Sequence, residues 1–325
     1  MRPVPAFPRR AVLAGVPVAA LSPAALAQPS WPTRPVRLVV PYAPGGPSDI
    51  IARTVQNPLS AALGQPVVVE NRPGGGAVIG TESVARSDDG HSFLVADSPH
   101  TIIPAVQPRV PYDAAADFAP VGLLGAVTMV LMVRAGHPAT DFASFLAGAL
   151  ARPESVTFGS SGVGSLTHLL PEWLGQLTGA RFTVVPYRGS GPALLDVAAG
   201  QIDAIFSSTL SASGQLRDGA VRALAVAAPE RVATLPQVPS FRENRVDLVC
   251  SNWWGVLAPS RAVPPVLARM AAALETSLAD AAVRERLDTL GVERRPAGPA
   301  PLATLLDTEF RNWAQVARAA GVRAP

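Results

Sequence analysis

The sequence has no lysine and a single cysteine, and these two absences exclude several kinds of chemistry. All 27 basic residues are arginine, so a Walker A phosphate loop, a Schiff-base lysine and a lysine general base are excluded. Cys250 is the one cysteine, so the chain forms no internal disulfide and no thiolate zinc site. The four histidines, at positions 91, 100, 137 and 168, show no metal-binding spacing. We therefore expect neither a metal nor a cofactor.

Charged residues are also scarce, and the arginines near the N-terminus account for the excess positive charge. Charged residues make up 16% of the chain, hydrophobic residues 48%, and the formal net charge is +3. Arg2, Arg9 and Arg10 precede an apolar run over 11–21, and an A-x-A motif ends at Ala27, which is typical of a secretory signal cleaved after that residue. Without those three arginines the net charge is zero, so no nucleic-acid partner is expected. The Sec and twin-arginine export routes both stay open.

The order of apolar segments predicts an α/β fold. Short apolar runs at 36–40, 67–69 and 93–96 predict strands, and they alternate with helical periodicity over 48–59 and 77–85. Strands that alternate with helices in this way indicate a parallel sheet covered on both faces. Predicted strands and helices alternate in the same way again in the second half of the chain, before its last third. At this length, two domains are expected.

Two long apolar segments, 121–133 and 248–257, predict strands that cross between the two domains. They divide the mature chain into a discontinuous first lobe, 28–125 with 248–325, and a second lobe, 126–247. Residues 1–27 precede both lobes as the signal peptide. The first lobe is expected to end in three helices, over 263–278, 281–290 and 302–319.

Two glycine-rich loops follow predicted strands, at the strand ends where open α/β sheets bind ligands. Residues 41–49 (PYAPGGPSD) place two glycines before a helix, whose N-terminus favours an anion. The alternative is a rigid turn in which Asp49 only caps the helix. Residues 158–168 (FGSSGVGSLTH) have the glycine spacing of a phosphate loop, but Ser165 stands where lysine is required. The second loop therefore predicts a neutral cradle for a carboxylate rather than a nucleotide site.

Two further loops carry polar residues after predicted strands. Residues 97–101 provide hydroxyl groups and the imidazole of His100, and residues 186–191 provide Arg188. A guanidinium pairs well with a carboxylate through two hydrogen bonds, although Arg188 is equally interpreted as a surface cation.

Ser165 and His168 lie one helical turn apart, which leaves a secreted serine-type hydrolase as the alternative function. A catalytic pair needs an orienting carboxylate and an oxyanion hole, and the G-x-S-x-G motif is absent from the sequence. We therefore interpret His168 as a structural or ligand-contacting residue and expect the protein not to be an enzyme.

These same segments carry a family resemblance. Residues 41–53 (PYAPGGPSDIIAR), 67–76 (VVVENRPGGG), 162–168 and 186–189 (PYRG) resemble the Bug-type solute receptors of tripartite tricarboxylate transporters. The resemblance extends over nearly the whole mature chain. Further matching segments are 112–113, 117–121, 200–203, 222–226, 236–241, 254–259 and Trp313.

The resemblance implies a class II periplasmic binding fold, in which two α/β lobes joined by two crossing strands close on a small carboxylate. It implies a monomeric periplasmic receptor that delivers an organic acid to a membrane transporter or a sensor. The loops at 42–49 and 160–165 are expected to face each other across the cleft. The expected ligand-binding residues are Tyr42, Ala43, Gly45, Gly46, Ser48, Asp49, Ser98, His100, Ser160, Ser161, Gly164, Ser165, Arg188 and Asp203.

The sequence departs from the family pattern at three positions. Ile103 stands where the family usually has asparagine, Arg188 replaces the usual lysine, and Pro58 is expected to kink or split the first helix. The exchange at Ile103 predicts the loss of one ligand contact. Trp253 and Trp254 are expected to pack in the core of a crossing strand rather than to stack on an aromatic ligand.

Overall fold

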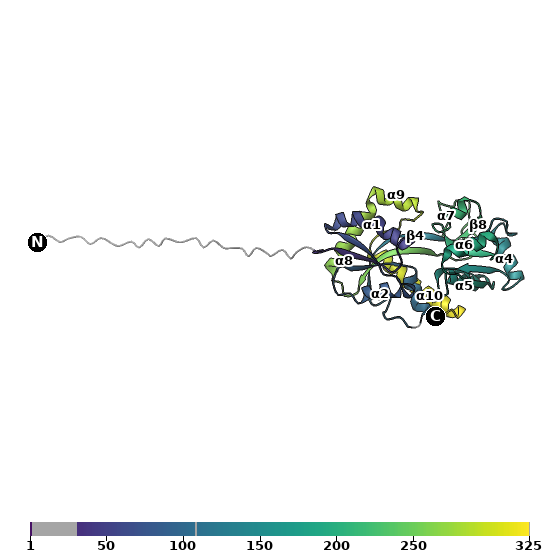
Figure 1. Ribbon diagram of the computed structural model, residues 1–325, viewed down its shortest axis with the longest axis horizontal. Helices are drawn as coiled ribbons and strands as arrows, with labels where there is room; N and C mark the ends of the chain where they lie inside the picture. The colour runs from purple at the N-terminus through teal and green to yellow at the C-terminus, as the bar shows by residue number, and fades with distance from the viewer. Residues whose placement is uncertain (2–30, 108, 325) are drawn as a thin grey trace. The chain divides into compact units, whose positions relative to one another are not determined.

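The computed structural model describes Met1, residues 31–107 and residues 109–324 (Figure 1). Apart from Met1, the expected signal peptide and its cleavage site after Ala27 lie outside the described residues. The chain from Trp31 onward forms one compact unit. Among the described helices, none is long and apolar enough to cross a membrane.

One half of the unit is a mainly parallel sheet. Strands β2 (Val67–Asn71), β1 (Val36–Val40) and β3 (Ser92–Asp97) lie side by side and parallel. Strand β9 (Ser251–Pro259) runs antiparallel next to β3, with Trp254 opposite Asp97. The strands predicted at the start of the chain are confirmed.

The longest strand, β4 (Phe118–Arg134), belongs to both halves of the unit. Its first part, residues 118–128, pairs with β9. Its last part, residues 129–134, pairs with β7 (Ala204–Ser208) and β8 (Val221–Val226) instead. The prediction that residues 121–133 form a crossing strand is therefore confirmed. Nearly every residue of β4 is buried, which explains why its sequence is apolar almost throughout.

The other half of the unit continues the sheet from β4. Strands β5 (Thr157–Ser160) and β6 (Thr183–Pro186) lie beyond β7, and β5 is parallel to both of its neighbours. The strand order across the whole sheet is β2-β1-β3-β9-β4-β7-β5-β6, with β8 on β4. The carboxyl ends of parallel strands from both halves therefore approach each other near the middle of the unit.

Helices cover both faces of the sheet (Figure 1). Leu38 of β1 packs with α1 and α8, whereas Val39 packs with α2 and α10 on the opposite face. Burial on both faces favours apolar residues at successive positions, as at Leu38, Val39 and Val40 of β1. The described helices are α1 (Pro47–Leu63), α2 (Val78–Ala85), α3 (Pro99–Val106), α4 (Phe142–Ala151), α5 (Leu166–Thr178), α6 (Ser190–Ala199), α7 (Ser213–Arg217), α8 (Pro264–Ala279), α9 (Ala281–Thr289) and α10 (Pro299–Ala320), with a short 3-10 turn η1 (Gly75–Ala77) before α2.

Of the two outcomes predicted for Pro58, a split of the first helix is wrong, and a kink stays a prediction. Helix α1 runs unbroken past Pro58, because Val55, Leu59 and Leu63 on either side are buried against the sheet. Tertiary packing therefore outweighs the backbone hydrogen bond that proline removes. The helix begins at Pro47 with Gly46 as its N-cap, so it starts earlier than expected.

Helix α3 differs from the prediction of a loop at 97–101, although the segment contains Pro99 and Pro104. Pro99 is tolerated in the first turn of the helix, where its missing N–H has no partner to lose. Ile102, Ile103 and Val106 are buried on its packed face. The prediction for the two tryptophans is confirmed, since Trp253 and Trp254 are both buried in the core.

Candidate functional site

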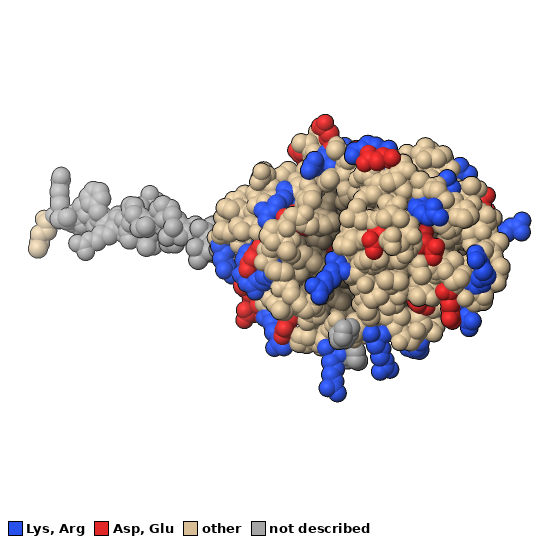
Figure 2. Space-filling model, turned by 45° about the vertical axis from the view of Figure 1, so that its right-hand side comes forward, with Lys and Arg blue, Asp and Glu red and all other residues tan. Residues whose placement is uncertain are grey.

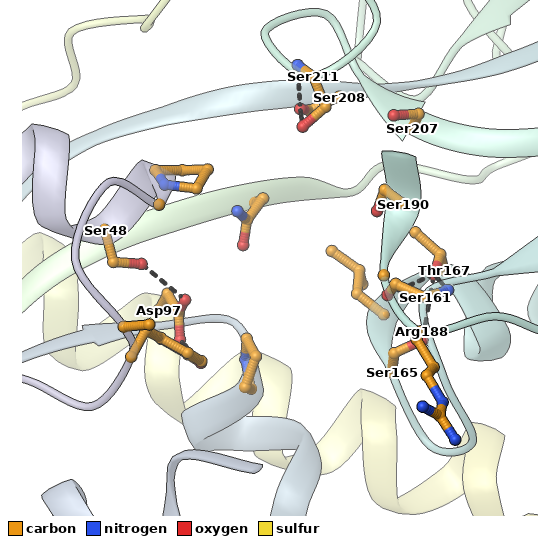
Figure 3. A pocket seen from close by; sticks show the side chains of 18 of the residues that line it. Ser48, Asp97, Ser161, Ser165, Thr167, Arg188, Ser190, Ser207, Ser208 and Ser211 are labelled. Atoms are coloured by element: carbon orange, nitrogen blue, oxygen red, sulfur yellow. Dashed lines mark hydrogen bonds between the residues drawn. The ribbon is translucent and has the colours of Figure 1, made fainter. Parts of the chain in front are cut away.

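A cavity of about 900 Å³ opens between the two halves of the unit, at the carboxyl ends of β1, β3, β5 and β6 (Figure 3). Open α/β sheets bind ligands at this edge. Figure 2 shows a groove between two bulky parts of one face, with arginines and carboxylates interspersed rather than gathered into a basic patch. The cavity is lined by Tyr42, Ala43, Pro44, Gly45, Gly46, Pro47, Ser48, Asp97, Pro99, Met129, Ser161, Ser165, Leu166, Thr167, Arg188, Gly189, Ser190, Ser207, Ser208, Ser211 and Asn252.

The loop between β1 and α1 is held in shape by Asp49. Its carboxylate accepts a hydrogen bond from the backbone N–H of Gly45 at 2.9 Å and others from Arg53 and Asn71. The Arg53 hydrogen bond is the main cause that lowers the pKa of Asp49 to about 2. Gly45 adopts a positive φ of 85°, which its lack of a side chain permits. Asp49 therefore shapes this wall of the cavity from behind it.

Asp97, at the end of β3, contributes a buried carboxylate to the same wall. The hydroxyl of Tyr42 donates to Oδ1 at 2.7 Å, and the hydroxyl of Ser48 donates to Oδ2 at 3.0 Å. The indole of Trp254 in turn donates to Ser48 Oγ at 3.0 Å. Burial raises the pKa of Asp97 to about 6. The group is therefore mostly ionised at neutral pH.

The loop after β5 forms the facing wall and caps α5. Ser165 Oγ accepts from the backbone N–H of His168 and donates to the carbonyl of Gly162. The His168 ring accepts from the backbone N–H of Gly164 through Nδ1 at 3.2 Å. Burial lowers the pKa of His168, which favours the neutral ring that such an acceptor requires. In the described chain the Ser165 hydroxyl caps α5, and no hydrogen bond joins it to the His168 ring.

Hydroxyl groups and one guanidinium complete this facing wall. Arg188 and Ser190 lie at the start of α6, and Figure 3 shows Arg188 beside Ser165 at the start of α5. Helix N-termini carry partial positive charge and favour an anion. Ser207 Oγ, at the end of β7, is buried and has no hydrogen-bond partner among the described residues. An unsatisfied buried hydroxyl beside a cavity is a group that a ligand would satisfy.

Eight of the fourteen predicted site residues line the cavity. They are Tyr42, Ala43, Gly45, Gly46, Ser48, Ser161, Ser165 and Arg188. The two loops that were expected to face each other do lie on opposite walls (Figure 3). That these residues contact a ligand stays a prediction.

The other six predicted residues lie outside the cavity lining. Asp49 supports the first loop, as described above. The Ser98 hydroxyl donates to the carbonyl of Ser251, His100 pairs through Nε2 with the carbonyl of Ala114, and Asp203 accepts from the backbone and side chain of Thr157. Ser160 is buried at the end of β5, and Gly164 adopts a φ of 74° next to Val106. That these six residues contact a ligand stays a prediction as well.

Several lining residues were missed from the sequence. Asp97 follows a buried strand and precedes two hydroxyl-bearing residues, but we assigned only its neighbours to the site. Ser207, Ser208 and Ser211 form a serine-rich segment directly after an apolar run, which is a usable signal for a strand end facing a ligand. Asn252 lies inside the apolar strand β9, where the sequence gives no indication of a site.

Known proteins match this chain along most of its length. The model of the "Tripartite tricarboxylate transporter family receptor" family matches residues 51–322. BugT of Bordetella pertussis is 34% identical over 298 residues, which are 90% of this chain and 91% of BugT. MatC of Rhodopseudomonas palustris, solved with bound malate, has a TM-score of 0.75 and 33% identity over 88% of this chain and 99% of MatC. Rpa4515 of R. palustris, solved with adipate, has a TM-score of 0.78 and 30% identity over 90% and 99% of the two chains. The expected two-lobed α/β fold is confirmed.

Proposed function

Because this chain belongs to the receptor family of the tripartite tricarboxylate transporters, we propose that it binds a small organic acid in the cavity between its lobes and delivers it to a membrane transporter or a sensor. We propose that it acts in the periplasm as a monomer, without catalysis, after cleavage behind Ala27. Its lobes are 28–125 with 248–325, and 126–247. The relatives solved with malate and adipate support a carboxylate ligand.

The observation that carries this proposal is the wall of hydroxyl groups and helix N-termini that ends at Arg188. Micromolar affinity requires about −8 kcal/mol. A hydrogen bond to a charged group contributes roughly 1.5–3 kcal/mol, so several such donors supply this affinity if the cavity excludes water. Backbone amides, hydroxyls and one guanidinium are sufficient without lysine.

A thermal-shift screen with mono-, di- and tricarboxylates and amino acids tests the proposal. A ligand at one hundred times its Kd stabilises the folded state by about 2.7 kcal/mol. For a protein of this size we expect an increase in Tm of several degrees. The absence of a shift with every acid of the panel would contradict the proposal.

Two variants then test the location of the site. Ser207→Ala removes a hydroxyl that is unsatisfied in the described structure, so we expect unchanged or higher stability of the free protein together with weaker binding of the acid. Arg188→Ala is expected to weaken binding about tenfold. Arg181→Ala is the matched control, because the Arg181 side chain is exposed, pairs with exposed Glu154 and lies outside the cavity lining. Equal affinities for all three variants and the unsubstituted chain would place the site elsewhere.

A further inference from the structure

The cavity carries two charged lining residues of opposite sign on different walls. Asp97 lies on the wall formed by β3 and the loop before α1, and Arg188 lies on the wall formed by the starts of α5 and α6 (Figure 3). The other lining residues in the described chain are uncharged. The cavity therefore has a negative side and a positive side.

The contacts of Asp97 suit a carboxylate, because neutral hydroxyl donors lie beside both of its oxygens. Because Ser48 Oγ accepts the indole N–H of Trp254, its own hydrogen is free for Asp97 Oδ2. The hydroxyl of Tyr42 donates to Oδ1, and the pKa of Tyr42 is raised well above its ordinary value by burial and by Asp97. Both oxygens thus accept hydrogen bonds from neutral donors, and each keeps a second lone pair.

The charge of Asp97 has no counterion within the described residues, where no arginine forms an ion pair with it. A buried carboxylate that is stabilised only by hydroxyl groups favours a cation and disfavours a second anion. The backbone N–H of Gly45 on the same wall is not available to a ligand, because it already donates a hydrogen bond to Asp49. A ligand carboxylate placed on this side would meet a like charge.

The facing wall has the opposite character. Ser161, Ser165 and Ser190 lie with Arg188 at the N-terminal ends of two helices. Hydroxyl donors, a guanidinium and two positive helix ends together favour an anion. The two walls thus suit opposite ends of one ligand.

We infer that the ligand is a zwitterion whose carboxylate binds beside Arg188 and whose protonated amine binds Asp97. The inference rests on the proposed function and names the ligand class of the same site. Asp97 then selects an acid that carries an amino group over a dicarboxylate of the same length. The alternative, in which Asp97 takes up a proton and donates it to the second carboxylate of a diacid, is an outcome of the test.

The test uses matched ligand pairs in which an aminomethyl group replaces one carboxylate. The pairs are succinate with 4-aminobutyrate, glutarate with 5-aminovalerate, adipate with 6-aminohexanoate, and benzene-1,3-dicarboxylate with 3-(aminomethyl)benzoate. Isothermal titration at pH 7.5 is expected to show at least tenfold tighter binding of the amino acid in the best-fitting pair. Asp97→Asn is expected to weaken the amino acid tenfold or more and to strengthen the diacid.

Two controls are needed to interpret the titrations. Arg181→Ala changes an exposed arginine outside the cavity lining, so the preference for the amino acid is expected to persist in this variant. On the unsubstituted protein, titration in two buffers of different ionisation enthalpy is expected to show no proton uptake with the amino acid. The groups that face Asp97 are Tyr42, Ser48 and Trp254, with Arg188 across the cavity.

The outcomes separate this inference from the proposed function. Tighter binding of the diacid than of the amino acid overturns the zwitterion in either of two cases: the ratio of their two Kd values is the same in Asp97→Asn, or the diacid binds with uptake of one proton. In both cases the protein is still a receptor for an organic acid. If no diacid, amino acid or other carboxylate binds, the proposed function fails and this inference fails with it.

Discussion

Glu309 is a buried acid that joins three elements of the structure. Its Oε2 accepts hydrogen bonds from Trp253 Nε1 and Thr101 Oγ1, both at 2.7 Å. The side chain belongs to α10, and its partners belong to β9 and α3. Burial raises the pKa of Glu309 to about 7, from an ordinary value of 4.5. Between pH 4.5 and about 7, Glu309 is therefore mostly protonated in the folded state and mostly ionised in the unfolded chain.

This difference predicts a pH-dependent effect of Glu309→Gln. As the pH rises from 4.5 through 7, the folded state binds more protons at this site than the unfolded state, so the site's contribution to stability falls. The glutamine side chain does not ionise, and the stability of the variant relative to the unsubstituted protein is expected to increase from pH 5 to pH 8. The rise in the pKa from 4.5 to about 7 sets an upper limit of about 3 kcal/mol on this increase.

Urea denaturation at pH 5 and pH 8 measures this effect. Other buried titratable groups, such as Asp97 and His100, are present in both proteins and cancel in the difference. The constant cost of exchanging the side chain also cancels, because only the change with pH is compared. A stability difference that is the same at both pH values would show that Glu309 does not titrate in this range.

Single residues also show where sequence reasoning stops. Asp49 lies in the first turn of α1, and Asp97 is the last residue of β3. From the sequence we predict only Asp49 as a site residue. In the structure, Arg53 and Asn71 hold Asp49 behind the loop, whereas Asp97 lines the cavity. The ionic partner of Asp49, Arg53, is only four residues away on the same helix, whereas the hydroxyl groups that hold Asp97 come from Tyr42 and Ser48, 55 and 49 residues away, and local periodicity carries no information about them.

At the scale of elements, α2 approaches the backbone of the first site loop at Gly80. A Cβ atom at this position would lie 2.7 Å from the carbonyl oxygen of Arg72 and 2.7 Å from Cα of Pro41. Both of these are backbone atoms, which cannot move aside as a flexible side chain does. Pro41 begins the loop that leads to Tyr42 and the cavity. The small size of Gly80 thus sets the distance between α2 and this loop.

Gly80→Ala is therefore expected to destabilise the protein by about 1–3 kcal/mol through overpacking and to weaken ligand binding by moving the loop. Gly148→Ala in α4 is the matched control, because a Cβ atom there has open space within 4 Å. In a helix this control is expected to stabilise by about 0.5–1 kcal/mol. Chemical denaturation and ligand titration of both variants check the result, and equal stabilities would refute the close approach.

The elements themselves were largely predictable, because their apolar periodicity is local. Strand β1 has the predicted bounds, and α8 and α9 begin within one residue of prediction. The predictions that the structure contradicts involve segments that contain proline. Pro58 lies inside an unbroken helix and Pro99 starts an unexpected one, because tertiary burial outweighs the local preference in both segments.

At the scale of the whole molecule, few connections join the walls of the cavity. Strand β4 pairs in both halves of the sheet, the chain just before β9 bonds at Cys250 to Ala227 and Met129 of the second half, and α10 packs against α3, β4 and α5. The cavity of about 900 Å³ is larger than a short-chain acid fills. Tight binding that excludes water therefore requires the walls to approach each other.

We expect small-angle X-ray scattering to show a smaller radius of gyration with saturating ligand than without it. The reason is the closure of two halves that are joined by only a few elements. An acid that gives no thermal shift is the control and is expected to leave the curve unchanged. Identical curves with and without a bound ligand would show that the structure is already closed.

The global arrangement was only partly predictable. The two apolar segments long enough to cross between lobes were visible in the sequence, because β4 is buried along nearly its whole length. The position of Asn252 in the cavity lining was not visible, since it depends on the antiparallel pairing of β9 with both β3 and β4. Sheet pairing between distant segments is the information that a single sequence lacks.

The burial of the one cysteine has a practical consequence for making an optical sensor. Cys250 is 5% exposed, and burial raises the pKa of its thiol well above the ordinary value, so it reacts slowly with thiol-directed dyes. A new cysteine at exposed Val163, in the loop that carries Ser161 and Ser165, would be labelled selectively in the otherwise natural chain. Fluorescence from that dye would then report occupancy of the cavity in real time.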